Sequence, residues 1–204
     1  MQNRILILGA HPDDIEFAMG ATLAKLARDP RNYIFAAVFS PALQLPENKN
    51  ILNELRNSMK IYGIDYYIFD FRTRFFVIDS PEIQDRIFKL KQEFHPNIVY
   101  SPSPNALHPD HAVIGKAVSS VFQETSILVY EDIRGNHHQL INYWHEVTKA
   151  DAEKKIKALK CYQSQFKRKY FNFDQIYHLI SARGLQIGKK YAEGFENLRV
   201  IDAA

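Results

Sequence analysis

Short apolar runs alternate with helix-like patterns through the first two thirds of this chain of 204 residues. Runs of this length suit strands that are buried on both faces, and a strand–helix–strand series is typical of a parallel sheet covered by helices. We therefore predict an α/β fold with a doubly wound, mainly parallel, Rossmann-like sheet. The expected strands are 4–8, 33–39, 66–69, 98–100 and 127–130. One expected helix starts at 14, and three others span 51–61, 81–94 and 110–122.

The pattern changes after residue 131. A polar loop follows, then one further strand expected at 140–147 and two helices. There is no linker, repeat or low-complexity segment, and 204 residues with 46% hydrophobic content can form one core. The prediction is a single domain over residues 1–204 whose C-terminal part adds helices to the sheet.

Positive charge is concentrated near the C-terminal end, although the formal net charge is only +3. From Lys149 to Tyr170 basic residues outnumber acidic ones, and such a segment could contact nucleic acid, a membrane surface or an anionic small molecule. Apolar residues with helical spacing favour instead an amphipathic helix with its lysines in solvent, and no nucleic acid partner. These residues are Ala152, Ile156, Leu159, Tyr162 and Phe166.

Cysteine use and hydropathy indicate a cytoplasmic protein. Cys161 is the single cysteine, so the chain forms no internal disulfide and no thiolate metal cluster. The apolar stretch near the N-terminus is too short for a signal peptide, and no run approaches the ~20 residues of a membrane span.

Two clusters of histidine and aspartate follow the first and fourth expected strands. Residues 10–14 are Ala-His-Pro-Asp-Asp, and residues 108–111 are His-Pro-Asp-His. The carboxyl ends of parallel strands meet at one edge of the sheet, so both clusters should face one cavity. Imidazole and carboxylate without cysteine suit a catalytic zinc that has three protein ligands and an open position. A carboxylate outside the ligand set could accept a proton, and a free imidazole could stabilise an oxyanion or protonate a leaving amine.

Each cluster also has a purely structural explanation. Two aspartates at a helix start often cap it, and an isolated His-x-x-His is usually surface sequence. The position of both clusters after strands favours the metal site. Other common chemistries lack their motifs, since the chain has no Gly-x-Gly-x-x-Gly after the first strand, no Walker A sequence and no Gly-x-Ser-x-Gly.

The two clusters resemble the paired signatures of the PIG-L/LmbE-like family of zinc-dependent N-acetylglucosaminyl deacetylases. The first signature covers residues 10–16 with Gly20, and the second covers 108–111. Weaker landmarks of that family extend the resemblance over nearly the whole chain. They are residues 54–59, 62–63, 130–131, 157–165, 183–184 and 191–195.

The resemblance implies a role for each residue of the first cluster. His11 and Asp14, together with His111 from the second cluster, would bind Zn²⁺. Asp13 would be the general base.

Three further roles follow from the same resemblance. His108 would stabilise the oxyanion or act as the general acid, and Asp110 would orient an imidazole and tune its charge. Arg74 is similar to a family arginine near the sugar pocket, although an exposed loop arginine explains it nearly as well.

Some positions depart from the family pattern. Ile15 stands where an acidic residue is usual, Ala21 where a second glycine is usual, and Ile51 where many relatives have an arginine. None of these is an expected ligand, so the differences concern loop packing and substrate contacts. His137 and His138 match no family ligand pair and are expected in an exposed polar loop.

The implied activity is removal of the N-acetyl group from an N-acetylated amino sugar or its conjugate, by attack of zinc-bound water. The alternatives are an amidase for another N-acyl substrate and a sugar-binding relative without catalysis. The expected partner is a small N-acetylated sugar or glycoconjugate, and a homo-oligomer is compatible with the sequence.

Overall fold

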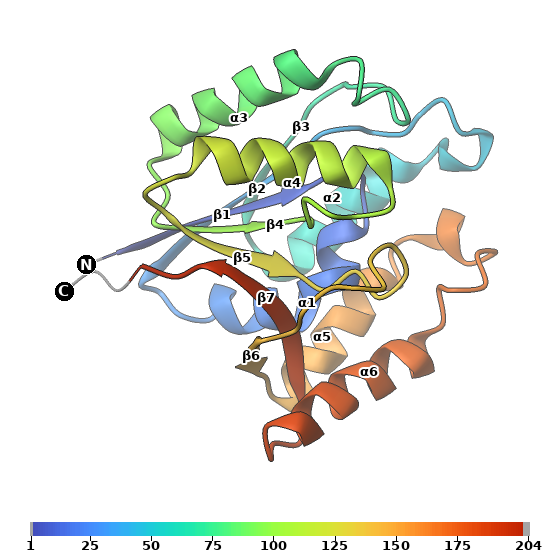
Figure 1. Ribbon diagram of the computed structural model, residues 1–204. Helices are drawn as coiled ribbons and strands as arrows, with labels where there is room; N and C mark the ends of the chain where they lie inside the picture. The colour runs from blue at the N-terminus through green and yellow to red at the C-terminus, as the bar shows by residue number, and fades with distance from the viewer. Residues whose placement is uncertain (1, 202–204) are drawn as a thin grey trace.

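Five parallel strands form the part of the sheet that the apolar runs predicted (Figure 1). They are β1 (Asn3–Gly9), β2 (Asn32–Val38), β3 (Asp65–Ile68), β4 (Ile98–Ser101) and β5 (Ser126–Tyr130). The computed structural model describes residues 2–201, and its sheet has the order β3-β2-β1-β4-β5-β7-β6. Winding reverses between β1 and β4, as in doubly wound folds, so the predicted α/β class is confirmed.

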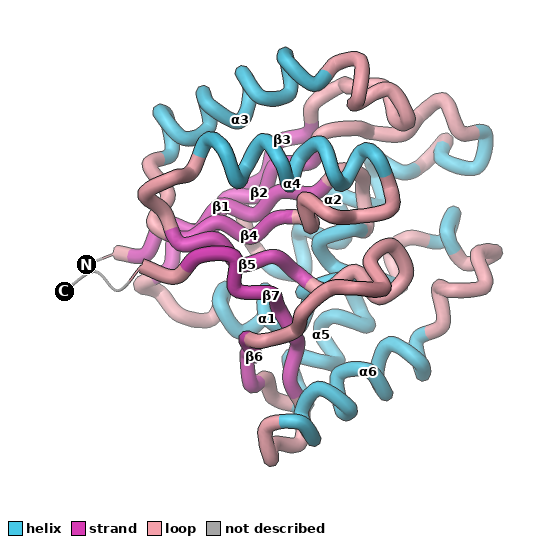
Figure 2. Tube along the Cα trace, viewed as in Figure 1, coloured by secondary structure: helices cyan, strands magenta, loops and turns pink. Residues whose placement is uncertain are grey.

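Helices cover both faces of this sheet (Figure 2). α1 (Asp14–Ala27), α2 (Ile51–Tyr62) and α5 (Lys149–Leu159) pack on the face that carries Ile5 and Ile7. α3 (Ser80–Phe94) and α4 (Pro109–Val121) pack on the face that carries Leu6 and Leu8. All four of these β1 side chains are almost fully buried, which is why this strand is an unbroken apolar run.

The C-terminal part contains a strand that the sequence analysis missed. β6 (Tyr143–Glu146) and α6 (Phe173–Gln186) were expected, but β7 (Ala192–Arg199) was not. β7 lies between β5 and β6 and pairs antiparallel with both. Its sequence, Ala-Glu-Gly-Phe-Glu-Asn-Leu-Arg, has little intrinsic strand preference, so pairing with two distant segments decides its conformation.

The prediction that the C-terminal lysines lie in solvent is wrong for Lys155. α5 ends at Leu159 and a 3₁₀ turn follows at Gln163–Gln165, so the apolar face does not continue to Phe166, which is 46% exposed. Lys155 is buried with its Nζ 2.5 Å from Oε1 of Glu193. The pairing of the two charges makes the burial of both tolerable.

Glu193 also stabilises a break in α1. The helix has a non-helical backbone at Met19. The two carboxylate oxygens of Glu193 then accept hydrogen bonds from the backbone N–H groups of Ala21 (3.2 Å) and Thr22 (2.6 Å). Glu193 thereby supplies acceptors to backbone donors in the interior of the protein, where water cannot serve them. β7 therefore helps to hold the helix that begins at Asp14.

Among residues 2–201, no helix is both long enough and apolar enough to cross a membrane.

Stability should depend on His145 of β6 as the pH falls. The Tyr100 hydroxyl is 2.8 Å from His145 Nε2, and burial, aided by the charge of Lys25, lowers the pKa of His145 to about 4. The unfolded chain, with an ordinary histidine pKa of about 6.5, binds the proton more readily. The stabilisation is complete above about pH 6.5 and is lost between about pH 6.5 and pH 4, a loss of at most about 3 kcal/mol.

Urea unfolding of the parent and of His145→Gln at a series of pH values measures this contribution. The glutamine can still accept the Tyr100 hydrogen bond but does not titrate. We expect the free energy of unfolding of the variant to fall less steeply below about pH 6.5. Parallel curves for the two proteins would contradict the assignment.

Candidate metal centre

Loops that follow the parallel strands line one cavity of about 520 Å³ at the carboxyl edge of the sheet. Six of the predicted site residues lie in its wall: His11, Asp13, Asp14, Arg74, His108 and His111. The seventh, Asp110, is fully buried behind them. The structure therefore brings together the two clusters that stand about a hundred residues apart in the sequence.

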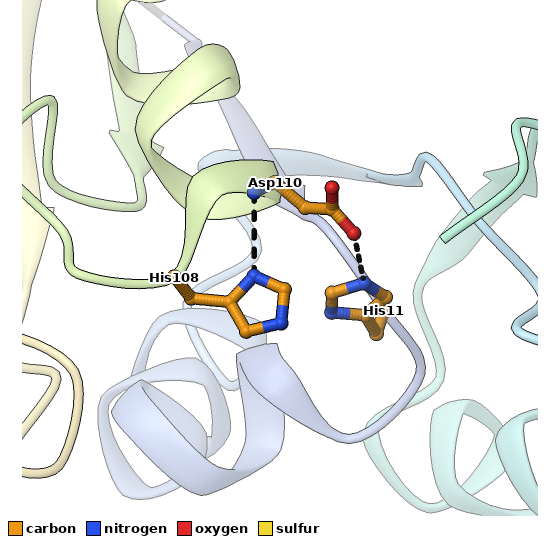
Figure 3. Close-up of side chains that lie close together, drawn as sticks. All are labelled: His11, His108 and Asp110. Atoms are coloured by element: carbon orange, nitrogen blue, oxygen red, sulfur yellow. Dashed lines mark hydrogen bonds and ion pairs between the residues drawn. The ribbon is translucent and has the colours of Figure 1, made fainter. Parts of the chain in front are cut away.

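Asp110 holds the imidazole of His11 (Figure 3). Its Oδ2 atom is 3.0 Å from His11 Nε2 and accepts hydrogen bonds from the Thr73 hydroxyl (3.0 Å) and the Arg74 backbone N–H (2.6 Å). Burial raises the pKa of Asp110, but these donors more than offset it and the net shift is downward. A carboxylate only accepts, so His11 carries its proton on Nε2 and has Nδ1 free.

The ring of His111 also lies between two carboxylates, although its buried Nδ1 atom makes no hydrogen bond within residues 2–201. Its Nδ1 atom is 3.5 Å from Oδ2 of Asp132, while its Nε2 is 3.2 Å from Oδ2 of Asp14. Burial lowers the pKa of His111, but Asp14 and Asp132 outweigh this and raise it to about 10. Asp132 was not predicted as a site residue. Its position two residues after the strand expected at 127–130 was the available signal.

These contacts fit a divalent cation between three side chains. Ligand atoms of His11, Asp14 and His111 lie within 4.8 Å of one another. Asp14 Oδ2 is 3.5 Å from His11 Nδ1 and 3.2 Å from His111 Nε2, so both nitrogens face one carboxylate and would coordinate a cation after losing any proton they carry. Histidines whose second nitrogen is held by a carboxylate are typical of zinc sites, so the donor set suits Zn²⁺.

A second group, His11, His108 and Asp110, is equally close together. It is less suited to a metal because Asp110 Oδ2 already serves three partners. Within this group, His11 Nε2 is already held by Asp110 and lies 2.5 Å from the Thr73 hydroxyl. The first group leaves these contacts intact.

Asp13 lines the cavity and does not cap the helix. It stands at the N-cap position of α1, but its side chain makes no capping hydrogen bond. Its φ of 83° is in the left-handed region, where a non-glycine residue is strained, and such strain often marks functional sites. Burial, followed by the charges of Asp14 and Glu16, raises the pKa of Asp13 well above its ordinary value. A capping hydrogen bond therefore does not explain this aspartate.

His108 is the N-cap residue of α4, and within residues 2–201 its ring forms no ion pair with a carboxylate. Its Nδ1 atom accepts a hydrogen bond from the Asp110 backbone N–H at 3.2 Å, so the neutral ring carries its proton on Nε2. Its ring lies 5.2 Å from that of His11 and 5.0 Å from that of His111. Burial, with the two neighbouring histidines, lowers the pKa of His108. The imidazole that Asp110 contacts is thus His11 rather than His108.

The other residues considered from the sequence are Arg74, His137 and His138. Arg74 has an exposed side chain at the cavity wall and a φ of 71°. His137 and His138 are exposed in the loop after β5, as predicted. Two further arginines, Arg134 and Arg168, line the cavity and were not predicted as site residues.

The family described as PIG-L: GlcNAc-PI de-N-acetylase matches residues 6–122, which include both histidine clusters. This chain belongs to the PIG-L family. The resemblance inferred from the two signatures is confirmed. The match ends before Asp132 and the C-terminal landmarks.

Solved structures extend the similarity in fold beyond the PIG-L match. The conserved protein TT1542 from Thermus thermophilus is 19% identical with a TM-score of 0.80. The alignment covers 100% of this chain and 98% of the TT1542 chain. The N,N'-diacetylchitobiose deacetylase from Pyrococcus horikoshii is 21% identical with a TM-score of 0.76. The alignment covers 94% of this chain and 82% of the deacetylase chain.

A hydratase has the same fold. GalB, the 4-carboxy-2-hydroxymuconate hydratase of Pseudomonas putida, is 16% identical with a TM-score of 0.76, and all of each chain is covered. The fold is therefore compatible with more than one reaction, and the residues of the site must decide the chemistry.

The ligand assignment predicts about one zinc per chain in the purified protein. His11→Ala, Asp14→Ala and His111→Ala should each abolish tight binding, whereas His108→Ala should retain it. Asp132→Asn should weaken binding by about 10- to 100-fold, because it loosens the imidazole of His111. Elemental analysis and calorimetric zinc titration measure both effects. Tight binding in His111→Ala and its loss in His108→Ala would point to the other group of residues.

Proposed function

We propose that this protein is a zinc-dependent N-deacetylase that acts on an N-acetylated amino sugar or its conjugate. The observation that carries the proposal is the division of roles within one cavity. His11, Asp14 and His111 can hold Zn²⁺, while Asp13 and His108 lie beside them without belonging to that set. Membership of a family described by de-N-acetylation supports the choice of an acetamide as the group that reacts.

Zn²⁺, when bound, would polarise the acetamide carbonyl and lower the pKa of a water molecule to about 7. Asp13, which lines the same cavity, would take the proton of the attacking water. Its raised pKa makes it a stronger base than an ordinary aspartate, and also lets it hold the proton until the C–N bond begins to break. It would then return that proton to the leaving amine, so acetate and a free amine are formed without another acid.

His108 would stabilise the oxyanion as a neutral ring. Its Nδ1 is occupied by the Asp110 N–H, which leaves an Nε2–H group to donate. An imidazolium would have to give up that backbone hydrogen bond, and the lowered pKa of His108 agrees with a neutral ring. Of the two roles that the family resemblance implies, we therefore favour oxyanion stabilisation over general acid catalysis.

Amine release from a panel of substrates tests the proposed reaction. The panel should contain N-acetylated amino sugars, their conjugates, and N-acetylated amino acids as a comparison. Asp13→Asn should retain zinc and lose on the order of a hundredfold or more in turnover on the best substrate. Amine release by the parent from no member of the panel would refute the proposal. Undiminished turnover in Asp13→Asn would refute the role of Asp13 alone.

The role of His108 can be tested by its variants and their pH profiles. His108→Ala should retain zinc and lose about 10²- to 10³-fold in kcat, the usual cost of one oxyanion donor. His108→Gln, whose amide can donate, should recover part of the loss. The alkaline limb of the rate profile should stay in place in both, because a neutral ring does not lose a proton there. Loss of the alkaline limb in both variants would instead indicate that His108 acts as a general acid.

A further inference from the structure

A tyrosine with two arginines forms one wall of the cavity, apart from the metal ligands. The guanidinium carbon of Arg134 lies 3.5 Å from the centroid of the Tyr170 ring. Nη1 of Arg168 donates to the Tyr170 hydroxyl at 2.7 Å, and its guanidinium carbon lies 6.0 Å from the same centroid. All three residues line the cavity that also holds Asp13. The ring therefore positions two positive charges at one place.

These two charges are poorly neutralised by the protein itself. Within residues 2–201, Arg134 makes no ion pair. Arg168 makes one, at 3.5 Å with the exposed carboxylate of Glu47, and is also attracted by the charge of Asp13. Arg183 is different, because both oxygens of Glu131 accept hydrogen bonds from its guanidinium. Two like charges held around one ring repel each other unless an anion joins them.

The cavity is larger than the reacting group needs. Its volume of about 520 Å³ is in the range of pockets that bind a whole small molecule, whereas an acetamide is a few atoms. Asp13, Asp14 and Asp132 make the metal end rich in carboxylates. An anionic group on the substrate would be repelled from free carboxylates and attracted to the arginines, which sets the direction in which the substrate lies.

We propose that Arg134 and Arg168, positioned by Tyr170, bind an anionic substituent of the substrate while its acetamide lies at the metal ligands. The substituent is a phosphate or a carboxylate, since both accept the paired hydrogen bonds of a guanidinium. This inference rests on the proposed deacetylase function. It narrows the substrate class from any N-acetylated amino sugar to acidic conjugates.

Three matched substrates test the proposal: N-acetylglucosamine 1-phosphate, the carboxymethyl glycoside of N-acetylglucosamine and its neutral methyl glycoside. The zinc-loaded parent should have a higher kcat/KM for at least one acidic substrate than for the neutral one. If the 1-phosphate is the better substrate, the substituent is a phosphate. If the carboxymethyl glycoside is the better one, it is a carboxylate. Arg134→Gln and Arg168→Gln should each lower this ratio about tenfold, the usual scale for one charge-assisted contact. The ratio of kcat/KM for acidic and neutral substrates is measured because Arg168 also acts electrostatically on Asp13, and a change at Asp13 would affect all three substrates alike.

Arg86→Gln is the matched control, because Arg86 pairs with Glu82 on the surface of α3 away from the cavity lining. It should leave the ratio unchanged. A parent enzyme without preference for either acidic substrate, or a preference that survives both arginine substitutions, would overturn the proposal.

Binding separates this inference from the proposed reaction. The same three probes are titrated by calorimetry into zinc-loaded Asp13→Asn, with and without Arg134→Gln. Tighter binding of an acidic probe that is lost with Arg134 supports the anion subsite even if the parent releases no amine. Equal binding of acidic and neutral probes refutes the subsite even if the parent deacetylates all three.

Discussion

The buried carboxylate of Asp110 joins three separate segments of the active-site region. It accepts hydrogen bonds from the loop after β3 through Thr73 and Arg74, contacts His11 after β1, and itself belongs to the first turn of α4. A buried charge without partners would cost several kcal/mol, so these segments must close around it together. Removing the carboxylate would leave the donors unpaired and free the ring of His11. The position of the candidate metal ligands thus depends on a residue outside the candidate ligand set.

Carboxylates surround both imidazoles of the candidate metal site. Asp110 and Asp132 each lie against one nitrogen of His11 and His111, and the other two nitrogens face Asp14. The hydrogen bond to Asp110 determines which nitrogen of His11 carries the proton, and hence which one is available to a metal. This arrangement gives the two histidines similar surroundings. It leaves His108, which has a backbone N–H in place of a carboxylate, as the neutral ring of the three.

Much of the fold could be predicted because local pattern and tertiary structure agree. Strands buried on both faces need continuous apolar sequence, so β1 to β5 were recognised within one or two residues at each end. β7 and Lys155 could not be recognised in this way. The strand is held by pairing with β5 and β6, and the lysine is buried because Glu193 of β7 lies opposite it. Neither partner is near in sequence, so no local pattern carries this information.

The sequence by itself determined the residue types of the site and their placement at strand ends. A parallel sheet brings such ends to one edge, so His11 and His111 had to lie near each other. The tertiary structure decided which atoms face which. It placed Asp110 against His11, left Asp13 without a capping bond, and added Asp132 and the arginines around Tyr170. The reason is physical: sheet topology follows from hydrophobic periodicity, whereas hydrogen-bond partners depend on side-chain positions that distant loops fix only after folding.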